Sequence, residues 1–510
     1  MDLIAIVIIL IVSATTFKWS YRRFTHPPLT GPPRWPIVGN LFQIPVHKPW
    51  VAFAEWKKQY GDFIPLTIFG RRLFVLNSRE AAVDLLEKRS AIYSDRPRRA
   101  MTDLCGFGKS APFQAYGSSF RKARKLMHTE LSQVNAQHHS SIQQQELLLF
   151  ITRISQFPQH NLAAETRRLA SSVILAISYG YQVKGSDDYF ISLAEKVMSY
   201  LERVVAPNNY LIDSLPILRY IPEWMPGAGF KKEARQCREL LYRMVSEPYG
   251  MVVSQMQNGG AMASLVSRNL EDSISQMNEE DSETLMWTAG GLFAAGSHTT
   301  AATIMFFFQT MLIYPHVQKR AQAELDVIVK EGRLPNLTDR PSLPYIDCII
   351  QELLRWRPAV PIGKSFHITT AHSSLSDDVY RGVHIPAGSV NMINIWALTH
   401  DEDVYESPED FNPDRFLSKD TPDPRLLVFG FGRRSCPGNI LIDNFIWMII
   451  ATALSTMDIL PPVDEDGKEI IPSTEYTSGA VIHPPPFNCR IIPRTKNSMD
   501  LISDAITAMT

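Results

Sequence analysis

One cysteine of this chain lies in a segment whose residue types suit metal binding. Cys436 belongs to the run FGFGRRSCPG, residues 429–438, which directly precedes an apolar segment of helical character, residues 439–454. The glycines let the backbone turn tightly and approach a flat ligand, and the predicted helix directs its positive dipole end toward the sulfur. With the adjacent arginines, the dipole favours the thiolate, which is the form that ligates metals. An isolated cysteine is usually a small buried apolar residue, but this context predicts a metal-ligating thiolate.

The run contains the pattern Phe-x-x-Gly-x-Arg-x-Cys-x-Gly, which consists of Phe429, Gly432, Arg434, Cys436 and Gly438. This pattern resembles the signature of the cytochrome P-450 family of haem-thiolate monooxygenases. The resemblance implies haem b as the cofactor, with Cys436 as the axial ligand of its iron and Arg434 in charge-assisted hydrogen bonds with a haem propionate. Three further motifs stand upstream in the family's order, so the resemblance covers essentially the whole chain after its N-terminal segment.

The second motif is the pair Phe120 and Arg124, which lie four residues apart on one face of a predicted basic helix. The family usually has Trp-x-x-x-Arg here, and both residues contact a propionate. Phe120 lacks the indole N–H, so the resemblance leaves Arg124 as the propionate partner. The nearby Arg121, Lys122 and Lys125 form either a solvated face or, as in the family, a docking surface for an acidic reductase.

The third motif lies in a long apolar helix predicted over residues 283–314. A glycine inside a helix costs about 1 kcal/mol, so the small residues of GGLFAAGSHTT, residues 290–300, need a reason, and room for dioxygen beside haem is the one we expect. The segment resembles the family's Ala-Gly-x-Asp/Glu-Thr-Thr. By this resemblance Thr299 assists oxygen activation, and Ala295 and Gly296 form its groove. Histidine, His298, occupies the position of the family's acid.

This departure at His298 leaves three interpretations open. The imidazole can relay protons near neutral pH. Alternatively, it points away from the cavity and water delivers protons through Thr299 alone. In the third interpretation, coupling is weakened and the enzyme catalyses a reaction other than oxygen insertion.

The fourth motif combines Glu352 and Arg355, one helical turn apart, with the run FNPDRF, residues 411–416. By itself the first pair is an ordinary helix ion pair. Together the two segments resemble the family's Glu-x-x-Arg and Phe-x-Pro-Glu/Asp-Arg-Phe. The resemblance implies a structural network of Glu352, Arg355 and Arg415 behind the haem, needed for folding rather than for chemistry.

The N-terminus reads as a membrane anchor, because residues 3–17 are almost continuously apolar and Lys18, Arg22 and Arg23 follow. About 15 apolar residues are short for a span, which needs roughly 17–25. A cleaved signal peptide is the alternative, but the charges follow the apolar run and no small-x-small site closes it. The positive-inside rule then predicts a single-pass anchor in the endoplasmic reticulum membrane with the catalytic body in the cytosol. We expect an anchor at 1–21, a proline-rich hinge at 22–40 and one haem-thiolate monooxygenase domain at 41–510.

Composition and periodicity fit such a body. The chain has 510 residues, a net charge of -1 and 20% charged residues. It therefore lacks the net positive charge that would favour binding to nucleic acid. Its five cysteines lack paired spacing, so no disulfide framework is predicted. Periodicity predicts helices at 48–60, 79–88 and through most of 115–354, and strands at 64–68, 72–76, 362–368 and 379–385. The predicted fold is mainly α with a small β portion, the cytochrome P-450 fold on an N-terminal membrane anchor.

Candidate substrate contacts are residues 98–113, 205–230 and 361–366, with Phe293 and Ala294 on the long helix. The segment 211–224 is apolar, broken by prolines and bears a tryptophan, so it either dips into the membrane or belongs to the core. Its composition resembles that of fungal members of the family that modify secondary metabolites.

We therefore expect a monooxygenase that inserts one oxygen atom of O₂ into a lipophilic small molecule, a terpenoid first and an aromatic or polyketide compound second. No flavin or dinucleotide fingerprint is present, so electrons come from NADPH through a separate NADPH-cytochrome P-450 reductase. Dehydration or isomerisation without net oxygen insertion is the rival reaction. A haem-bearing binder or sensor is disfavoured, because Cys436 and Thr299 are both present.

Overall fold

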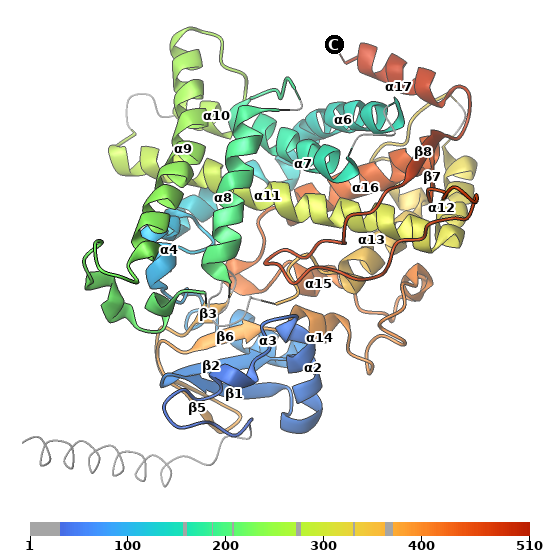
Figure 1. Ribbon diagram of the computed structural model, residues 1–510. Coiled ribbons are helices and arrows are strands. Elements are labelled where there is room, and N and C mark those ends of the chain that lie inside the picture. Colours follow the sequence, from blue (N-terminus) through green and yellow to red (C-terminus); the bar gives the residue numbers. More distant parts are fainter. Residues whose placement is uncertain are drawn as a thin grey trace, which may run out of the picture.

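The computed structural model describes residues 31–156, 161–185, 187–206, 209–271, 277–329, 332–362 and 371–509 (Figure 1). The expected anchor at 1–21, the first part of the expected hinge, and nearly all of the expected strand at 362–368 lie outside these residues. So does most of the candidate substrate segment 361–366.

Helices make up most of the fold. The longer ones are α2 (Pro49–Tyr60), α5 (Ser118–Glu130), α6 (Gln133–Gln156), α7 (Leu162–Tyr179), α8 (Tyr189–Val205), α9 (Gly229–Gln257), α11 (Glu279–Ile313), α12 (Pro315–Ile328), α13 (Pro344–Trp356), α16 (Asn439–Thr456) and α17 (Ser498–Thr507). The shorter ones are α3 (Arg79–Ala82), α4 (Ala100–Cys105), α10 (Leu265–Glu271), α14 (Ile395–Thr399) and α15 (Arg425–Val428). Single turns are η1 (Leu41–Gln43), η3 (Phe107–Lys109), η4 (Leu211–Asp213), η5 (Pro216–Tyr220), η6 (Arg340–Ser342), η7 (Pro413–Leu417) and η8 (Gly432–Arg434), and η2 (Val83–Lys88) is a π-helical turn. The expectation of a mainly helical fold is confirmed.

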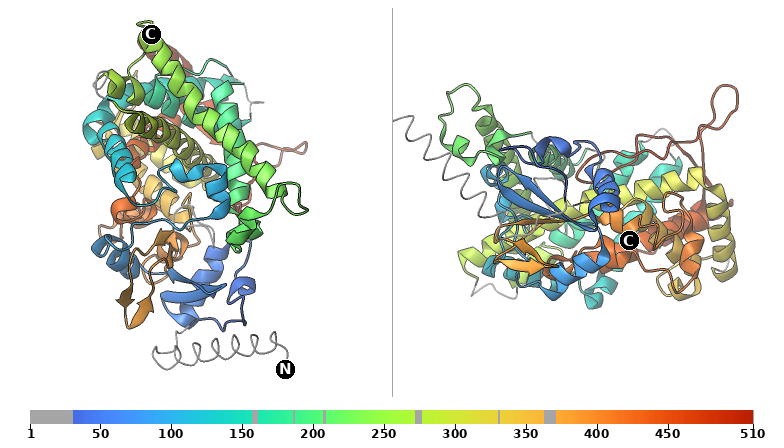
Figure 2. Two further views of the ribbon diagram at one scale, coloured as in Figure 1. Left: turned by 90° about the vertical axis from the view of Figure 1, so that its left-hand side faces the viewer. Right: turned by 90° about the horizontal axis from the view of Figure 1, so that it is seen from below.

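A small sheet lies at one end of the molecule, below the helices in Figure 1 and at the bottom of the left panel of Figure 2. Its strand order is β1-β2-β6-β3, with β1 (Phe63–Ile68), β2 (Arg71–Leu76), β6 (Val390–Ile393) and β3 (His372–Ser373). β1 is antiparallel to β2, β2 is parallel to β6, and β3 is antiparallel to β6. In this register Ile64 lies opposite Val75, and Leu73 lies opposite Val390. Two two-stranded sheets pair β4 (Asp378–Tyr380) with β5 (Val383–Ile385) and β7 (Met457–Leu460) with β8 (Arg490–Pro493).

The single strand expected at 379–385 is wrong, because the chain reverses there and forms the β4–β5 hairpin. The two residues of its turn, Arg381 and Gly382, have positive φ values of 47° and 76°. Two successive left-handed residues close a tight hairpin whose twist matches that of the strands. The alternating pattern that suggests one strand is therefore shared between two.

The helix α11 runs through the middle of the helical part (Figure 1). It packs against α7, α9, α5 and α16, and most of its residues from Leu285 to Leu312 are buried. By length and composition, α11 and α16 could each cross a membrane, but most of each apolar window is buried inside the fold. A helix that is apolar on nearly every side is expected at the centre of a large domain.

Most of the apolar segment at 211–224 is exposed. Ile217, Tyr220 and Trp224 are 74%, 77% and 80% accessible to solvent, whereas Ile212 is fully buried in the core. The interpretation of the whole segment as core is therefore wrong, although its first part packs there at Ile212.

Candidate active site

The segment around Cys436 forms a tight loop between α15 and α16. The Cys436 amide donates a hydrogen bond of 2.7 Å to the Phe429 carbonyl. Gly430 and Gly432 have positive φ values of 74° and 58°, a conformation that glycine adopts without strain. A Cβ atom on Gly432 would lie 2.0 Å from the Leu86 carbonyl oxygen. Glycine is therefore required at 432 both by the backbone conformation and by the contact with η2.

Opposing effects act on the Cys436 thiol. Burial raises its pKa, whereas a hydrogen bond from the Gly438 N–H and the charge of Arg124 lower it, and burial prevails. The sequence alone predicts the opposite direction, because it shows the arginines and the helix dipole but not the desolvation of the sulfur. The thiolate therefore needs a further positive charge beside it, which a bound metal ion supplies.

Arg124 and Arg434 both come close to this loop. Arg124 of α5 donates a hydrogen bond of 3.2 Å to the Ser435 hydroxyl, and the Arg434 guanidinium lies 3.6 Å from the centre of the Phe120 ring. Phe120 itself is buried. Arg434 also donates to three backbone carbonyl oxygens, those of Ser94 (2.8 Å), Ala111 (3.1 Å) and Gln114 (2.8 Å).

Two residues that the sequence analysis did not identify join these arginines. Arg96 is buried and donates to the carbonyl oxygens of Pro112 (2.9 Å) and Ala371 (2.7 Å). His372 is buried too, and its Nδ1 lies 2.6 Å from the Tyr93 carbonyl oxygen. Both reach the site through long-range packing, and no local pattern in the sequence marks either of them.

We call Arg96, Arg124, Arg434 and His372 the basic cluster. Burial and the charge of Arg434 lower the pKa of Arg96 to about 9, and burial, followed by Arg96, lowers that of His372 to about 3. Burial also lowers the pKa of Arg434 to about 10. The charge of Asp95 opposes this shift, and the charge of Arg124 adds to it. Among the described residues, neither Arg124 nor Arg434 forms an ion pair with a carboxylate. The buried Arg96 beside the half-buried Arg124 and Arg434 concentrates positive charge that fits an anionic group such as the two propionates of haem.

An open face lies on α11. Ala295 is exposed and Thr299 is half-buried, although both stand in the middle of a largely buried helix. The Thr299 hydroxyl donates a hydrogen bond of 3.0 Å to the Ala295 carbonyl. Leu292, one turn before Ala295, packs against the cluster of Ala111, Ala123 and Met127, of which Ala123 and Met127 lie on α5 beside Arg124. This face therefore adjoins the helix that carries Arg124.

Close packing gives Gly296 a second reason to be small, beside the expected groove. A Cβ atom there would lie 2.9 Å from a side-chain carbon of Ile174 on α7. Gly290 is similar, because its Cβ would lie 2.4 Å from a methyl carbon of Val245 on α9. These glycines allow close helix packing, whereas a Cβ on Gly291 would meet only open space.

His298 is half-buried among basic neighbours. Burial, followed by the charge of Arg167 on α7, lowers its pKa to about 4, so the imidazole is neutral at neutral pH. His483, from the C-terminal segment, also lies near it, and the pKa of His483 is lowered to about 4 by burial and then by His298. The neighbours of His298 thus come from α7 and from the C-terminal segment.

Glu352, Arg355 and Arg415 are brought together in the interior. Arg355 binds the Glu352 carboxylate through Nε (2.7 Å) and Nη2 (2.8 Å), and both side chains are fully buried. The Nε of Arg415 lies 3.1 Å from each carboxylate oxygen, and the Asn412 amide adds a bond of 2.7 Å. The remaining Arg355 donors bind the carbonyls of Pro408 (2.7 Å), Thr399 (3.1 Å) and Asp410 (3.1 Å). One buried carboxylate therefore holds two guanidinium groups and the segment that follows α14.

The family model of cytochrome P-450 matches residues 29–490 of this chain. The chain belongs to the cytochrome P-450 family. The cytochrome P-450 monooxygenase 208 of Postia placenta is 37% identical over 502 residues, which cover 97% of this chain and 96% of that protein. The cytochrome P-450 monooxygenase claR of Ampulloclitocybe clavipes is 37% identical over 488 residues, which cover 94% of this chain and 89% of that protein.

A solved structure of a zebra fish cytochrome P-450 with progesterone has a TM-score of 0.71 and 23% sequence identity, and the match covers 88% of this chain and 99% of that one. At this identity the likeness shows the fold alone. With the family established, the protein is an enzyme, a cytochrome P-450 monooxygenase, and its cofactor is haem. Enzymes of this family use O₂, a redox partner and, in general, lipophilic substrates.

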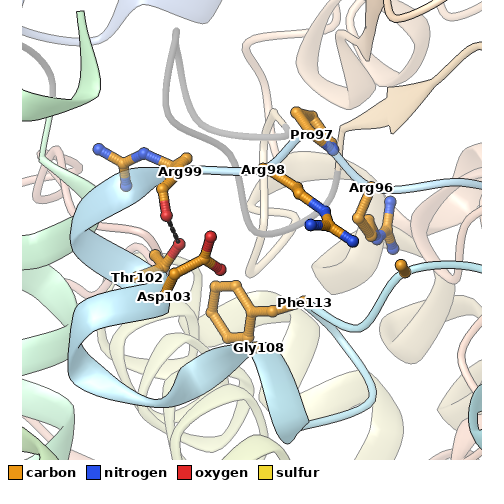
Figure 3. A pocket seen from close by; sticks show the side chains of 9 residues that line it. Arg96, Pro97, Arg98, Arg99, Thr102, Asp103, Gly108 and Phe113 are labelled. Carbon is orange, nitrogen blue, oxygen red and sulfur yellow. Dashed lines mark hydrogen bonds between the residues drawn. The ribbon is translucent and has the colours of Figure 1, made fainter. Parts of the chain in front are cut away.

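Of the candidate substrate contacts in this cytochrome P-450, residues 98–113 border a cavity of about 260 Å³ (Figure 3). Arg98, Asp103 and Phe113 line it. On α11, Ala294 is half-buried, but Phe293 is fully buried in the core. We therefore no longer consider Phe293 a substrate contact.

Proposed function

We propose that Cys436 would ligate the haem iron and that Arg124, Arg434 and Arg96 would bind the haem propionates. The observation that carries this proposal is the half-buried Cys436, whose thiol accepts a hydrogen bond from the Gly438 N–H and lies near the charge of Arg124, with the basic cluster beside it. In the same proposal Phe429 and Gly432 shape the loop, Gly438 provides the N–H that is directed at the sulfur, and the Phe120 ring lies against the Arg434 guanidinium.

When bound, haem supplies the activation of O₂, and the chain positions groups around it. The Gly438 N–H and Arg124 stabilise negative charge on the Cys436 sulfur. The Thr299 hydroxyl stands at the open face of α11 and can move a proton there, with Ala295 beside it. Neutral His298 has a free ring nitrogen that can accept a proton, so it can pass protons from the side of α7 toward Thr299.

Glu352, Arg355 and Arg415 act on the fold rather than on the substrate. They fix the segment after α14 against α13 from the interior. In our proposal this rigid support keeps the following Cys436 loop in its conformation.

We further propose a single-pass anchor at 1–21, a hinge at 22–40 and a catalytic domain at 41–510 that faces the cytosol from the endoplasmic reticulum membrane. The exposed apolar segment at 211–224 supports contact with a membrane, because it would otherwise leave large apolar side chains in water. Electrons come from NADPH through a separate NADPH-cytochrome P-450 reductase.

The proposed reaction is insertion of one oxygen atom of O₂ into a lipophilic compound of fungal secondary metabolism, a terpenoid first and an aromatic or polyketide compound second. The fungal relatives support this assignment. A dehydration or isomerisation without net oxygen insertion is the second candidate, because neutral His298 stands where the family has an acid.

The test uses microsomes that contain this protein and a fungal reductase, supplied with ¹⁸O₂ and a mixed terpenoid and aromatic extract. A labelled product that disappears in Cys436→Ala supports monooxygenation. An unlabelled product that depends on Cys436 supports the second candidate. A Cys436→Ala protein that keeps the carbon monoxide spectrum of a thiolate-bound haem contradicts the ligand assignment.

A further inference from the structure

A cavity of about 260 Å³ lies beside α4, close to the basic cluster. Arg98, Asp103 and Phe113 point toward the space between them, whereas the Arg99 guanidinium points away from it (Figure 3). Ligand sites for drug-sized molecules usually measure about 300–1,000 Å³. This cavity therefore suits one end of a ligand rather than a whole molecule.

The arginines around the cavity are not equivalent. Arg99 is buried and already has partners for its guanidinium, since its Nη2 lies 2.7 Å from Asp213 Oδ2 and its Nη1 donates to the Val204 carbonyl at 2.8 Å. Arg96 belongs to the basic cluster, which the proposed function assigns to the haem propionates. Arg98 is exposed, and among the described residues none forms a hydrogen bond or ion pair with its guanidinium. Arg98 is thus the cation that remains available to a ligand.

Positive charge exceeds negative charge at this cavity. Among the described residues of its wall, Asp103 provides the one carboxylate, and the charges of Arg98 and of Arg219 of η5 act on it. A guanidinium binds a carboxylate through charge-assisted and often bidentate hydrogen bonds. Asp103 would repel the second charge of a dianion, so the wall selects a single negative charge.

Apolar surface adjoins the same cavity. The Phe113 ring forms part of the wall. Arg219, which lies between Leu218 and Tyr220 in the exposed apolar segment at 211–224, is close enough for its charge to act on Asp103. A ligand with its charged end at Arg98 can therefore place its adjoining carbon atoms against Phe113.

The cavity also shares a wall with the proposed haem site. Arg434 donates to the Ala111 and Gln114 carbonyls, and Arg96 donates to the Pro112 carbonyl. Phe113 lies within this same short segment and lines the cavity. Arg96, a member of the basic cluster, lines the cavity as well, so the cavity lies directly beside the proposed haem site.

We propose that this cavity is a substrate subsite that binds the carboxylate of a lipophilic monocarboxylic acid, with Arg98 as the anion-binding residue and Phe113 against the adjoining carbon atoms. The inference rests on the proposed function, because it assigns a substrate class to that enzyme. The carboxylate could have two sources, the substrate or a haem propionate, and the test separates them.

The experiment uses the haem-loaded full chain and two probes that differ only in charge, dodecanoic acid and methyl dodecanoate. Equilibrium dialysis measures the Kd of each probe, and the haem content per protein is measured in parallel. We expect the wild type to bind the acid more tightly than the ester. Arg98→Gln should weaken binding of the acid about tenfold or more and leave the ester within about twofold, while Arg98→Lys retains part of the affinity.

The matched control is Arg235→Gln, which removes an exposed arginine that pairs with Glu223 next to the same apolar segment and should change neither Kd. Equal losses for acid and ester, or no loss for the acid, overturn the inference. A fall in haem content in Arg98→Gln with an unchanged acid-to-ester ratio assigns Arg98 to a propionate instead, which also overturns it. If Arg98→Gln does not fold, the wild-type ratio and Arg98→Lys decide. A wild type without a thiolate-bound haem spectrum contradicts the proposed function, whereas lost discrimination in a protein that keeps this spectrum contradicts the subsite alone.

Discussion

Replacing Glu352 by glutamine should unfold the region that supports the Cys436 loop. The substitution keeps the shape of the side chain but removes the only carboxylate that contacts both Arg355 and Arg415 among the described residues. It also places an NH₂ group against N–H donors, because one oxygen of Glu352 is 2.7 Å from Arg355 Nε and the other is 2.8 Å from Nη2. The fully buried guanidinium of Arg355 then remains without its carboxylate partner.

The expected loss follows from the cost of breaking a buried ion pair from one side, about 3–5 kcal/mol. A folded domain has a total stability of about 5–15 kcal/mol, so Glu352→Gln removes a large part of it. The assay is urea unfolding followed by circular dichroism, together with haem content per protein. We expect a large fall in the urea midpoint and little retained haem.

The matched control for this prediction is Asp414→Asn. Asp414 pairs with Arg320 at 2.6 Å, but both side chains are 48% exposed, and such surface pairs contribute only about 0–1 kcal/mol. This control should fold and bind haem as the wild type does. If Glu352→Gln matches it in urea midpoint and haem content, the reasoning about the buried network is refuted.

Four further predictions follow from the same structure. His298→Ala should raise peroxide release per NADPH consumed, and unchanged coupling would remove His298 from proton delivery. Gly432→Ala should prevent stable haem binding, because its Cβ would meet the Leu86 carbonyl. Gly438→Ala should be tolerated, because its Cβ would keep 3.8 Å or more from its neighbours. Equal haem content in both variants would contradict this account of the loop. Arg124→Gln should weaken haem retention about tenfold or more, measured by transfer of haem to apomyoglobin, while Arg121→Gln on the same helix should not. His298, His372 and His483 have pKa values lowered to about 4, 3 and 4, whereas a histidine of the unfolded chain has a pKa of about 6.5, so the unfolded chain binds more protons below that pH. The free energy of unfolding should be full above about pH 6.5 and fall by about 1.4 kcal/mol per pH unit for each histidine between about pH 6 and 4. An unfolding midpoint that stays constant over this interval would contradict the prediction.

Much of this fold could be predicted because its signals are local. The helical period predicts α2 and α11 to within a few residues, and two short β-branched and aromatic runs predict β1 and β2. The Cys436 loop is marked by its glycines, and Glu352 and Arg355 stand one turn apart. Interactions that depend on long-range packing could not be predicted in this way.

The departures from prediction share this cause. Arg96 and His372 reach the basic cluster from segments with no distinctive pattern. Gly296 is small because Ile174 of another helix lies against it. The pKa of Cys436 is raised because burial, which no local sequence shows, outweighs both the Gly438 N–H and Arg124.

The electrostatics of the site link these separate observations. Without a ligand, the chain holds a thiol whose ionisation is opposed by desolvation, together with three neighbouring arginines, Arg96, Arg124 and Arg434, whose pKa values are lowered. A single ligand would remove both costs if it placed a cation next to the sulfur and two carboxylates next to the guanidinium groups. Haem has this composition. The residues that weaken the free protein are therefore the ones that we expect to bind its cofactor most tightly, and haem binding and folding stability should rise or fall together when any of them is changed.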